Sequence, residues 1–426
     1  MIRALLAATA LTFGSLAVLS SAQAEGVTVA ISCSSLGIEL QLCQTGADAW
    51  AKQTGNQVKL VSTPPDANER LSLYQTLLAA HSKDIDVFQI DAVWPGILAT
   101  HFIDLADAVP ADQKGDFFPT LIANDTVDGK LVAVPWFADA GLLYYRKDLL
   151  DKYHKPVPTT WAELADTAKA VMDGEKSATP DIQGYVWQGR SYEGLTCNAL
   201  EWVYSYGGGT IVDDKGKVSI DNPQAIKALE QARTWIGTIS PAGVLNYSEE
   251  ESRGVFQSGK AVFMRNWPYA WSLANAGDSP IKDKVGIAVL PQGDGSDAKH
   301  AATLGGQQLA VSKYSVHPKE AADLVRYLTG ADEEKRRAIQ GSFNPSRKSV
   351  YSDKDVQAAN PFFSGFQQIL ENAVARPSTV TGQKYNQVSS TFFQAVHGVL
   401  SGQSDAKSAM SGVDKTLDRV SHRGRW

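Results

Sequence analysis

The stretch Asp86-Val87-Phe88-Gln89-Ile90-Asp91 is a short run of β-branched and aromatic residues that ends on a carboxylate. Two similar runs precede it, Val27–Ile31 and Gln57–Ser62, and both have the composition of buried strands. Between the second and third runs, apolar residues recur at helical spacing over Leu71–Leu78, after a capping-box pattern at Asp66–Glu69. This alternation predicts an α/β protein with a largely parallel sheet covered by helices.

The alternation continues along the chain. Lys130–Pro135 has strand composition, a capping box at Thr160–Glu163 opens an amphipathic helix, and Ala321–Leu328 has the face of another helix. In open α/β sheets, ligands bind beyond the carboxyl ends of the strands. Asp91 and Asp139, which end strand-like runs, are therefore candidate site residues.

The stretch Arg265-Asn266-Trp267-Pro268-Tyr269-Ala270-Trp271 places three aromatic side chains within seven residues. A pyranose ring offers C–H faces that stack on an aromatic ring and a rim of hydroxyls that need hydrogen-bond partners. The stretch supplies both kinds of group, which favours a sugar site. The alternative is that its tryptophans are core residues, because large aromatic side chains dominate protein cores.

The N-terminus has the pattern of a secretory signal peptide. Arg3 precedes a short apolar run, and Ala22-Gln23-Ala24 is a small-residue cleavage site. We expect residues 1–24 to be a signal peptide cleaved after Ala24, so that the protein is exported. The net charge of −6 comes from scattered residues, which gives no electrostatic footprint for nucleic acid.

Three cysteines are present. In an oxidising compartment we expect Cys33 and Cys43 to form a disulfide, and the alternative is a pair of buried thiols. Cys197 would then be free and buried. The histidines and cysteines lack the spacing of a metal site, so neither a metal nor a cofactor is expected.

The carboxylates leave two chemistries open. Asp91, Asp139 and Glu39 could provide the acid and base of a glycosidase, which needs two carboxyl groups at a defined separation. Alternatively, they could accept hydrogen bonds from sugar hydroxyls, for which ionised carboxylates are strong acceptors. No catalytic residue is predicted on the second interpretation.

Several longer stretches resemble the periplasmic sugar-binding proteins of ABC importers, in particular the trehalose/maltose-binding proteins. The resemblance covers essentially the whole chain after the signal peptide. Its most specific parts are residues 139–150, 186–189 with 192–195, 265–271, 302–306, and 371–374 with 376–377.

The resemblance implies a two-lobed periplasmic binding protein fold of type II. Each lobe would be a mixed sheet flanked by helices, and hinge strands would join the lobes around the sugar site. The first lobe would comprise residues 25–136 and 304–350, and the second residues 137–303 and 351–426. The first crossing is expected near Val134–Ala138.

The resemblance also implies the function: capture of a glucose-containing disaccharide of the trehalose, maltose or sucrose type, and its delivery to an inner-membrane ABC permease. The protein would be a periplasmic monomer that performs no reaction. Another glucoside or an oligosaccharide is the alternative ligand. The implied sugar contacts are Glu39, Asp66, Arg70, Asp91, Phe137, Asp139, Trp267, Tyr269, Gly305, Gly306, Gln307 and Arg376.

Two of these positions depart from the family pattern. Gln307 replaces a tryptophan, which exchanges a stacking face for an amide, and Phe137 replaces a tyrosine, which removes a hydroxyl. A pocket that hydrogen-bonds a hydroxyl discriminates strongly between ligands, whereas an apolar one discriminates weakly. The sugar class therefore follows from the resemblance more directly than trehalose or maltose itself.

Overall fold

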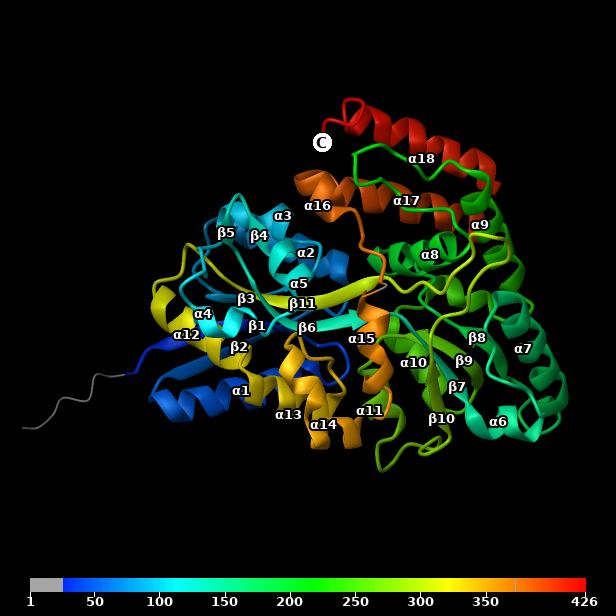
Figure 1. The fold of residues 1–426 in the computed structure, drawn as a ribbon, viewed down its shortest axis with the longest axis horizontal. Coiled ribbons are helices and arrows are strands. Elements are labelled where there is room, and N and C mark those ends of the chain that lie inside the picture. Colours follow the sequence, from blue (N-terminus) through cyan, green and yellow to red (C-terminus); the bar gives the residue numbers. More distant parts are fainter. Residues whose placement is uncertain (1–25, 372) are drawn as a thin grey trace, which may run out of the picture.

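The computed structural model describes residues 26–371 and 373–426 of the chain. The expected signal peptide, with its cleavage site after Ala24, lies outside the described residues, as does Asn372 of one family-like stretch. Figure 1 shows two α/β lobes side by side, with α17 and α18 on the outer part of the second lobe. Within the described ranges, every helix is too short or too polar to cross a membrane.

The first lobe is built on a mixed five-stranded sheet. β1 pairs in parallel with β2 and β3, whereas β11 pairs antiparallel with both β3 and β6. The strands, in spatial order, are β2 (Gln57–Thr63), β1 (Thr28–Ser34), β3 (Val87–Asp91), β11 (Leu304–Val311) and β6 (Val134–Ala140). The three predicted N-terminal strands are thus confirmed, and β11 reaches the sheet from far along the chain.

Both faces of this sheet are buried at β1 and β3: successive side chains point to opposite faces, and nearly all of them are buried. Val87 of β3 packs in the cluster beneath α1 (Glu39–Thr54) and α12 (Pro318–Leu328). Phe88 packs in the cluster beneath α2 (Ala67–Ala79). The short elements of this lobe are α3 (Pro95–Leu98), η1 (Ala99–His101), α4 (Ala111–Lys114), α5 (Pro119–Asn124), β4 (Thr126–Val127) and β5 (Lys130–Leu131).

The second lobe has a four-stranded sheet in which antiparallel pairs predominate. β7 pairs antiparallel with β10 and β9, whereas β8 pairs in parallel with β9. The order is β10 (Val285–Ala288), β7 (Leu142–Arg146), β9 (Ala261–Asn266) and β8 (Gln183–Val186). The prediction of a largely parallel sheet is therefore wrong for this lobe, because β7 pairs antiparallel with both of its neighbours, β10 and β9.

Helices cover the second sheet and pack on one another. The Thr160 capping box opens α7 as predicted, with both of its hydrogen bonds present. The helices here are α6 (Lys147–Lys152), α7 (Trp161–Glu175), α8 (Glu193–Ser205), α9 (Pro223–Trp235), η2 (Ala242–Asn246), α10 (Glu249–Gln257), α11 (Ala270–Ala274), α17 (Tyr385–Leu400) and α18 (Ala406–Val420). Elements near the junction are α13 (Ala331–Gly341), η3 (Lys348–Ser352), α14 (Lys354–Ala359), α15 (Phe363–Glu371), α16 (Ser378–Thr381) and η4 (Gly382–Lys384).

The chain passes between the lobes three times. The first crossing follows the expected stretch Val134–Ala138: Ala138 and Ala140 at the end of β6 pack in the core of the second lobe, and Gly141 alone separates β6 from β7. The second immediately precedes β11, at Thr303, and the third lies between Phe343, in the core of the first lobe, and Val350, in that of the second. Hydrogen bonds tie the second crossing to a neighbouring segment, since Leu304 N donates to Val374 O at 2.9 Å.

The cysteines follow the prediction. Cys33, in β1, and Cys43, in α1, form a disulfide with their Cα atoms 6.5 Å apart. Both lie in the core of the first lobe. Cys197, on α8, is free and buried, and burial raises the pKa of its thiol to about 12. The bond therefore fixes α1 to β1.

Candidate functional site

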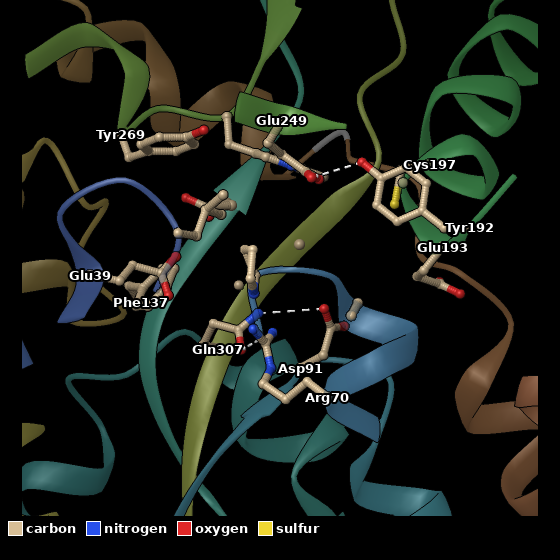
Figure 2. Close-up of a pocket in the computed structure, with 18 of the residues that line it drawn as sticks. Glu39, Arg70, Asp91, Phe137, Tyr192, Glu193, Cys197, Glu249, Tyr269 and Gln307 are labelled. Atoms are coloured by element: carbon tan, nitrogen blue, oxygen red, sulfur yellow. Dashed lines mark hydrogen bonds between the residues drawn. The ribbon is translucent and has the colours of Figure 1, made fainter. Parts of the chain in front are cut away.

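A cavity of about 60 Å³ lies between the lobes. Figure 2 shows its lining residues, which come from segments far apart in the sequence. They are Leu36, Glu39, Pro65, Ala67, Arg70, Asp91, Phe137, Asp139, Tyr192, Glu193, Gly194, Cys197, Glu249, Trp267, Tyr269, Gly305, Gly306, Gln307 and Arg376. The fold thus gathers carboxylates, guanidinium groups and aromatic rings around one small space.

Eleven of the twelve expected sugar contacts line this cavity. The exception is Asp66, which is not among the lining residues. Its Oδ1 caps α2 by accepting from Asn68 N at 2.8 Å and Glu69 N at 3.0 Å. Its Oδ2 forms an ion pair with Arg190 of the second lobe at 2.9 Å. Asp66 therefore works as a helix cap and an interlobe contact.

The floor on the side of the first lobe is polar. Asp91 ends β3 and lies opposite Gln307 in the β3–β11 register. Gln307 donates from Nε2 to Asp91 Oδ2 at 3.4 Å and accepts from Arg70 Nη2 at 3.4 Å. Figure 2 shows these three side chains grouped together beneath the cavity.

Arg376 links the two lobes through the cavity. Its Nη2 donates to Asp91 Oδ1 at 2.8 Å, and its Nη1 donates to Glu193 Oε1 at 2.7 Å. Glu193, the first residue of α8, also accepts from Tyr385 and from Ser389. Burial raises the pKa of Glu193, and the Arg376 cation opposes that rise. The guanidinium therefore holds a carboxylate of each lobe.

Trp267 is fixed from two sides. The guanidinium of Arg265 lies 3.9 Å from the centroid of its ring. Its Nε1 donates to Glu249 Oε1 at 3.3 Å, while Tyr192 donates to Glu249 Oε2 at 2.7 Å. Burial raises the pKa of Glu249, and these two hydrogen bonds oppose the rise. The indole is thus held at the cavity by a cation on its face and a carboxylate at its edge.

The remaining aromatic residues of the 265–271 stretch have different roles. Tyr269 is 2% exposed, lines the cavity and donates to Glu250 Oε1 at 2.7 Å. Trp271 instead packs edge-on against Phe362, with ring centroids 5.6 Å apart. Trp271 is therefore a partly buried residue that packs against the core of the second lobe, whereas Trp267 lies at the cavity.

Glu39 and Asp139 face the cavity near Phe137. Burial raises the pKa of Glu39, and the positive charge of Arg70 opposes the rise. Burial also raises the pKa of Asp139 well above its ordinary range, and the negative charge of Glu39 raises it further. Glu39 Oε2 accepts from Gln89 Nε2 at 2.8 Å, while Asn344 donates to Asp139 Oδ1 at 3.5 Å. Both groups keep an oxygen available for a hydroxyl donor.

Two glycines of β11 allow close approach. A Cβ on Gly306, whose φ is +119°, would lie 2.4 Å from Phe137 O. A Cβ on Gly305 would lie 3.0 Å from the Trp267 ring. The strand therefore needs glycine here to pass beside β6 and the indole.

Eight lining residues were not predicted: Tyr192, Glu193, Gly194, Cys197, Glu249, Leu36, Pro65 and Ala67. The first three lie in the stretch 192–195, so the resemblance of this stretch to the family could have identified them. Glu249 begins α10 within Glu249-Glu250-Glu251. Acidic residues are common in the first turn of a helix, where they stabilise the helix dipole, so the pattern does not indicate a binding residue.

Two α/β lobes joined by three crossings, with a polar and aromatic cavity between them, define a two-lobed binding protein fold of type II. The chain matches the bacterial extracellular solute-binding protein family over residues 43–335, and it belongs to that family.

Relatives agree with this assignment. A probable ABC transporter-binding protein of Deinococcus radiodurans is 52% identical over 95% of this chain and 96% of its own length. The solved structure of maltose-bound MalE3 from T. maritima is 40% identical, with a TM-score of 0.88 over 93% of this chain and 100% of that chain. A ribitol complex from Agrobacterium radiobacter K84 is 25% identical, with a TM-score of 0.82 over 93% and 99%.

Proposed function

We propose that this protein captures a glucose-containing disaccharide between its lobes and delivers it to the permease of an ABC importer. The observation that carries the proposal is the cavity in which Trp267 and Tyr269 face Glu39, Asp91 and Asp139. An aromatic ring suits the C–H face of a pyranose, and the carboxylates suit its hydroxyl donors. Trehalose, maltose and sucrose are the disaccharide types that we expect to bind.

The relatives support a sugar ligand and an importer. The Deinococcus relative is described as a probable ABC transporter-binding protein, and the similar MalE3 was solved with maltose. The ribitol complex shares the fold, so a related cleft takes a polyol. Another glucoside or an oligosaccharide is the alternative ligand.

The proposed cellular role follows from the N-terminal sequence. A signal peptide over residues 1–24 would send the mature chain to the periplasm as a monomer. There, the ligand would stabilise the closed arrangement of the lobes by contacting both of them. The permease would then recognise the closed, loaded protein.

A thermal-shift measurement of the purified protein tests this role. The panel comprises trehalose, maltose, sucrose, palatinose, glucosylglycerol and glucose, with the acidic monosaccharide glucuronate as a control. A ligand at a hundred times its dissociation constant stabilises by about 2.7 kcal/mol, which is an easily measured shift. A shift with one or a few neutral glucosides is expected, and no shift with any of them contradicts the proposal.

The same samples test the rival prediction of a glycoside hydrolase that uses Asp91 and Asp139. After prolonged incubation, the sugar is released by heating and analysed by chromatography. We expect the disaccharide to be recovered intact. Release of glucose that stops in an Asp139→Asn variant would establish hydrolysis instead.

A further inference from the structure

The cavity has two unlike sides. One side, the aromatic wall, comprises Tyr192, Trp267 and Tyr269; the other, the polar wall, comprises Arg70, Asp91, Gln307 and Arg376. Figure 2 shows Gln307, Asp91 and Arg70 together below the cavity and Tyr269 and Tyr192 above it. The two ends of a ligand that spans the cavity therefore meet different chemistry.

The rings beside the polar wall are engaged by other side chains. Phe137, opposite Gln307 in the β6–β11 register, packs edge-on against Phe343 with ring centroids 4.8 Å apart. Trp94 does not line the cavity, and the guanidinium of Arg70 lies over it at 5.3 Å from the ring centroid. Gln307 closes the rest of the wall with its amide. A second pyranose placed here would find no ring on which to stack.

Gln307 connects the groups of this wall by weak bonds. Its amide contacts Arg70 Nη2, Gln89 Nε2 and Asp91 Oδ2, each at 3.4 Å. These distances lie beyond the usual range for N–H···O hydrogen bonds, so a ligand hydroxyl can replace any of them at small cost. Gln307 is therefore placed to exchange its partners for those of a bound ligand.

The polar wall also has unused donors. Arg70 is 3% exposed and Arg376 is 4% exposed, and the Nε of each lacks a hydrogen-bond partner among the described residues. Buried donors without a partner are costly, so they favour a ligand that supplies acceptor oxygens. Hydroxyl oxygens on a flexible chain can reach separate donors more readily than those fixed on a ring.

We propose that Gln307 determines specificity, and that the preferred ligand is a hexopyranoside whose second unit is a short polyol. Its pyranose would stack on the aromatic wall, and its polyol would occupy the polar wall by hydrogen bonds alone. This inference rests on the proposed function and narrows its ligand.

Calorimetric titration with two α-glucosides, glucosylglycerol and trehalose, tests the proposed role of Gln307. Glucosylglycerol carries a glycerol unit where trehalose carries a second glucose. We expect the wild-type protein to bind glucosylglycerol about tenfold more tightly than trehalose, within the range of discrimination that one changed group provides. Gln307→Trp should reverse this order by adding a stacking face to the polar wall.

Two further variants separate the causes. Gln307→Leu keeps similar bulk without the amide, so it should lose glucosylglycerol affinity without gaining trehalose affinity. Trp267→Ala should lower the affinity for glucosylglycerol and the affinity for trehalose by the same factor. The melting temperature of each variant without ligand checks that it is folded.

The outcomes distinguish the two proposals. Wild-type preference for trehalose, unchanged in Gln307→Trp, would overturn the role of Gln307 and leave the proposed function standing. Failure of the wild type to bind any glucoside of the panel would overturn the proposed function and this inference with it.

Discussion

Each lobe buries an arginine whose guanidinium lies within 4 Å of the centroid of a tryptophan ring, and these two arginines are held in opposite ways. Arg265 lies over Trp267 and donates to Glu201 Oε2 at 2.9 Å and Oε1 at 2.5 Å. Arg337 lies 3.7 Å from the centroid of the Trp136 ring, and none of its three guanidinium nitrogens has a hydrogen-bond partner among the described residues.

This difference separates two ways of keeping a cation inside a protein. A buried ion pair with good geometry offsets its own loss of water, whereas an unpaired buried cation relies on aromatic faces and more distant charges. Burial lowers the pKa of Arg337, and the negative charge of Glu39 opposes that effect. Loss of the Glu201 carboxylate should therefore lower the stability of the protein, whereas loss of the Arg337 charge should be tolerated.

The largest expected effect is on the paired side. Glu201→Gln leaves the guanidinium of Arg265 buried without its counter-charge, which costs about 3–5 kcal/mol of folding free energy. Urea denaturation measures this loss. The double variant Glu201→Leu with Arg265→Met removes both charges and should recover most of the stability. If the single variant is as stable as the wild type, the pair is not what holds this cation.

The next effect concerns the ring that Arg265 supports. Trp267→Ala should weaken sugar binding by at least about 2 kcal/mol, as truncation of a central contact does, and Asp139→Ala should do the same. Calorimetry with the best ligand of the panel measures the loss. Trp426→Ala is the control, because that side chain lies away from the cavity and donates to Gly216 O at 2.7 Å. Wild-type affinity in Trp267→Ala would remove the stacking role.

The carboxylates near Arg337 should make stability depend on pH. Asp139 has a folded-state pKa well above 3.8, so its contribution is fully present below pH 3.8 and is lost as the pH rises through the folded value. Asp139→Asn cannot ionise, so without ligand it should gain stability relative to the wild type from pH 4 to 8. Each tenfold difference in proton affinity contributes about 1.4 kcal/mol. Urea denaturation at each pH measures the unfolding free energy of both proteins. A difference between them that stays constant from pH 4 to 8 would contradict the expected ionisation of Asp139.

The smallest effect should have the opposite sign to the first. Arg337→Met replaces a buried cation without hydrogen-bond partners by an apolar side chain of similar length, and it should stabilise the protein by about 1 kcal/mol. Arg337→Lys retains the charge and should show no gain. Destabilisation by Arg337→Met comparable to that of Glu201→Gln would mean that the two arginines are held alike.

Local patterns predicted the local elements of this fold. The runs before Asp91 became β1 to β3, and the Thr160 capping box opens α7. Strand direction in the second lobe could not be read in this way, because it depends on which strands pair. β11 is the clearest case, since it pairs between β3 and β6 after an entire lobe has intervened.

The same distinction between local sequence patterns and long-range packing applies to the residues of the candidate site. Strand-end carboxylates and the aromatic stretch gave Asp91, Asp139 and Trp267, and the family resemblance added Arg70 and Arg376. Glu249 could not be recognised, because its pattern is that of a helix start and only packing brings it to the indole. The partners of Arg376 were equally hidden, since Asp91 and Glu193 lie on different lobes.

The three crossings between the lobes have a consequence for connectivity. Because Gly141, Thr303 and the segment between Phe343 and Val350 each join the lobes, a cut in the backbone at any one of them leaves two covalent links in place. New chain termini opened in the Phe343–Val350 segment would thus preserve the two-lobed unit. A circularly permuted sensor, with its reporter inserted there, would convert relative movement of the lobes into an optical signal.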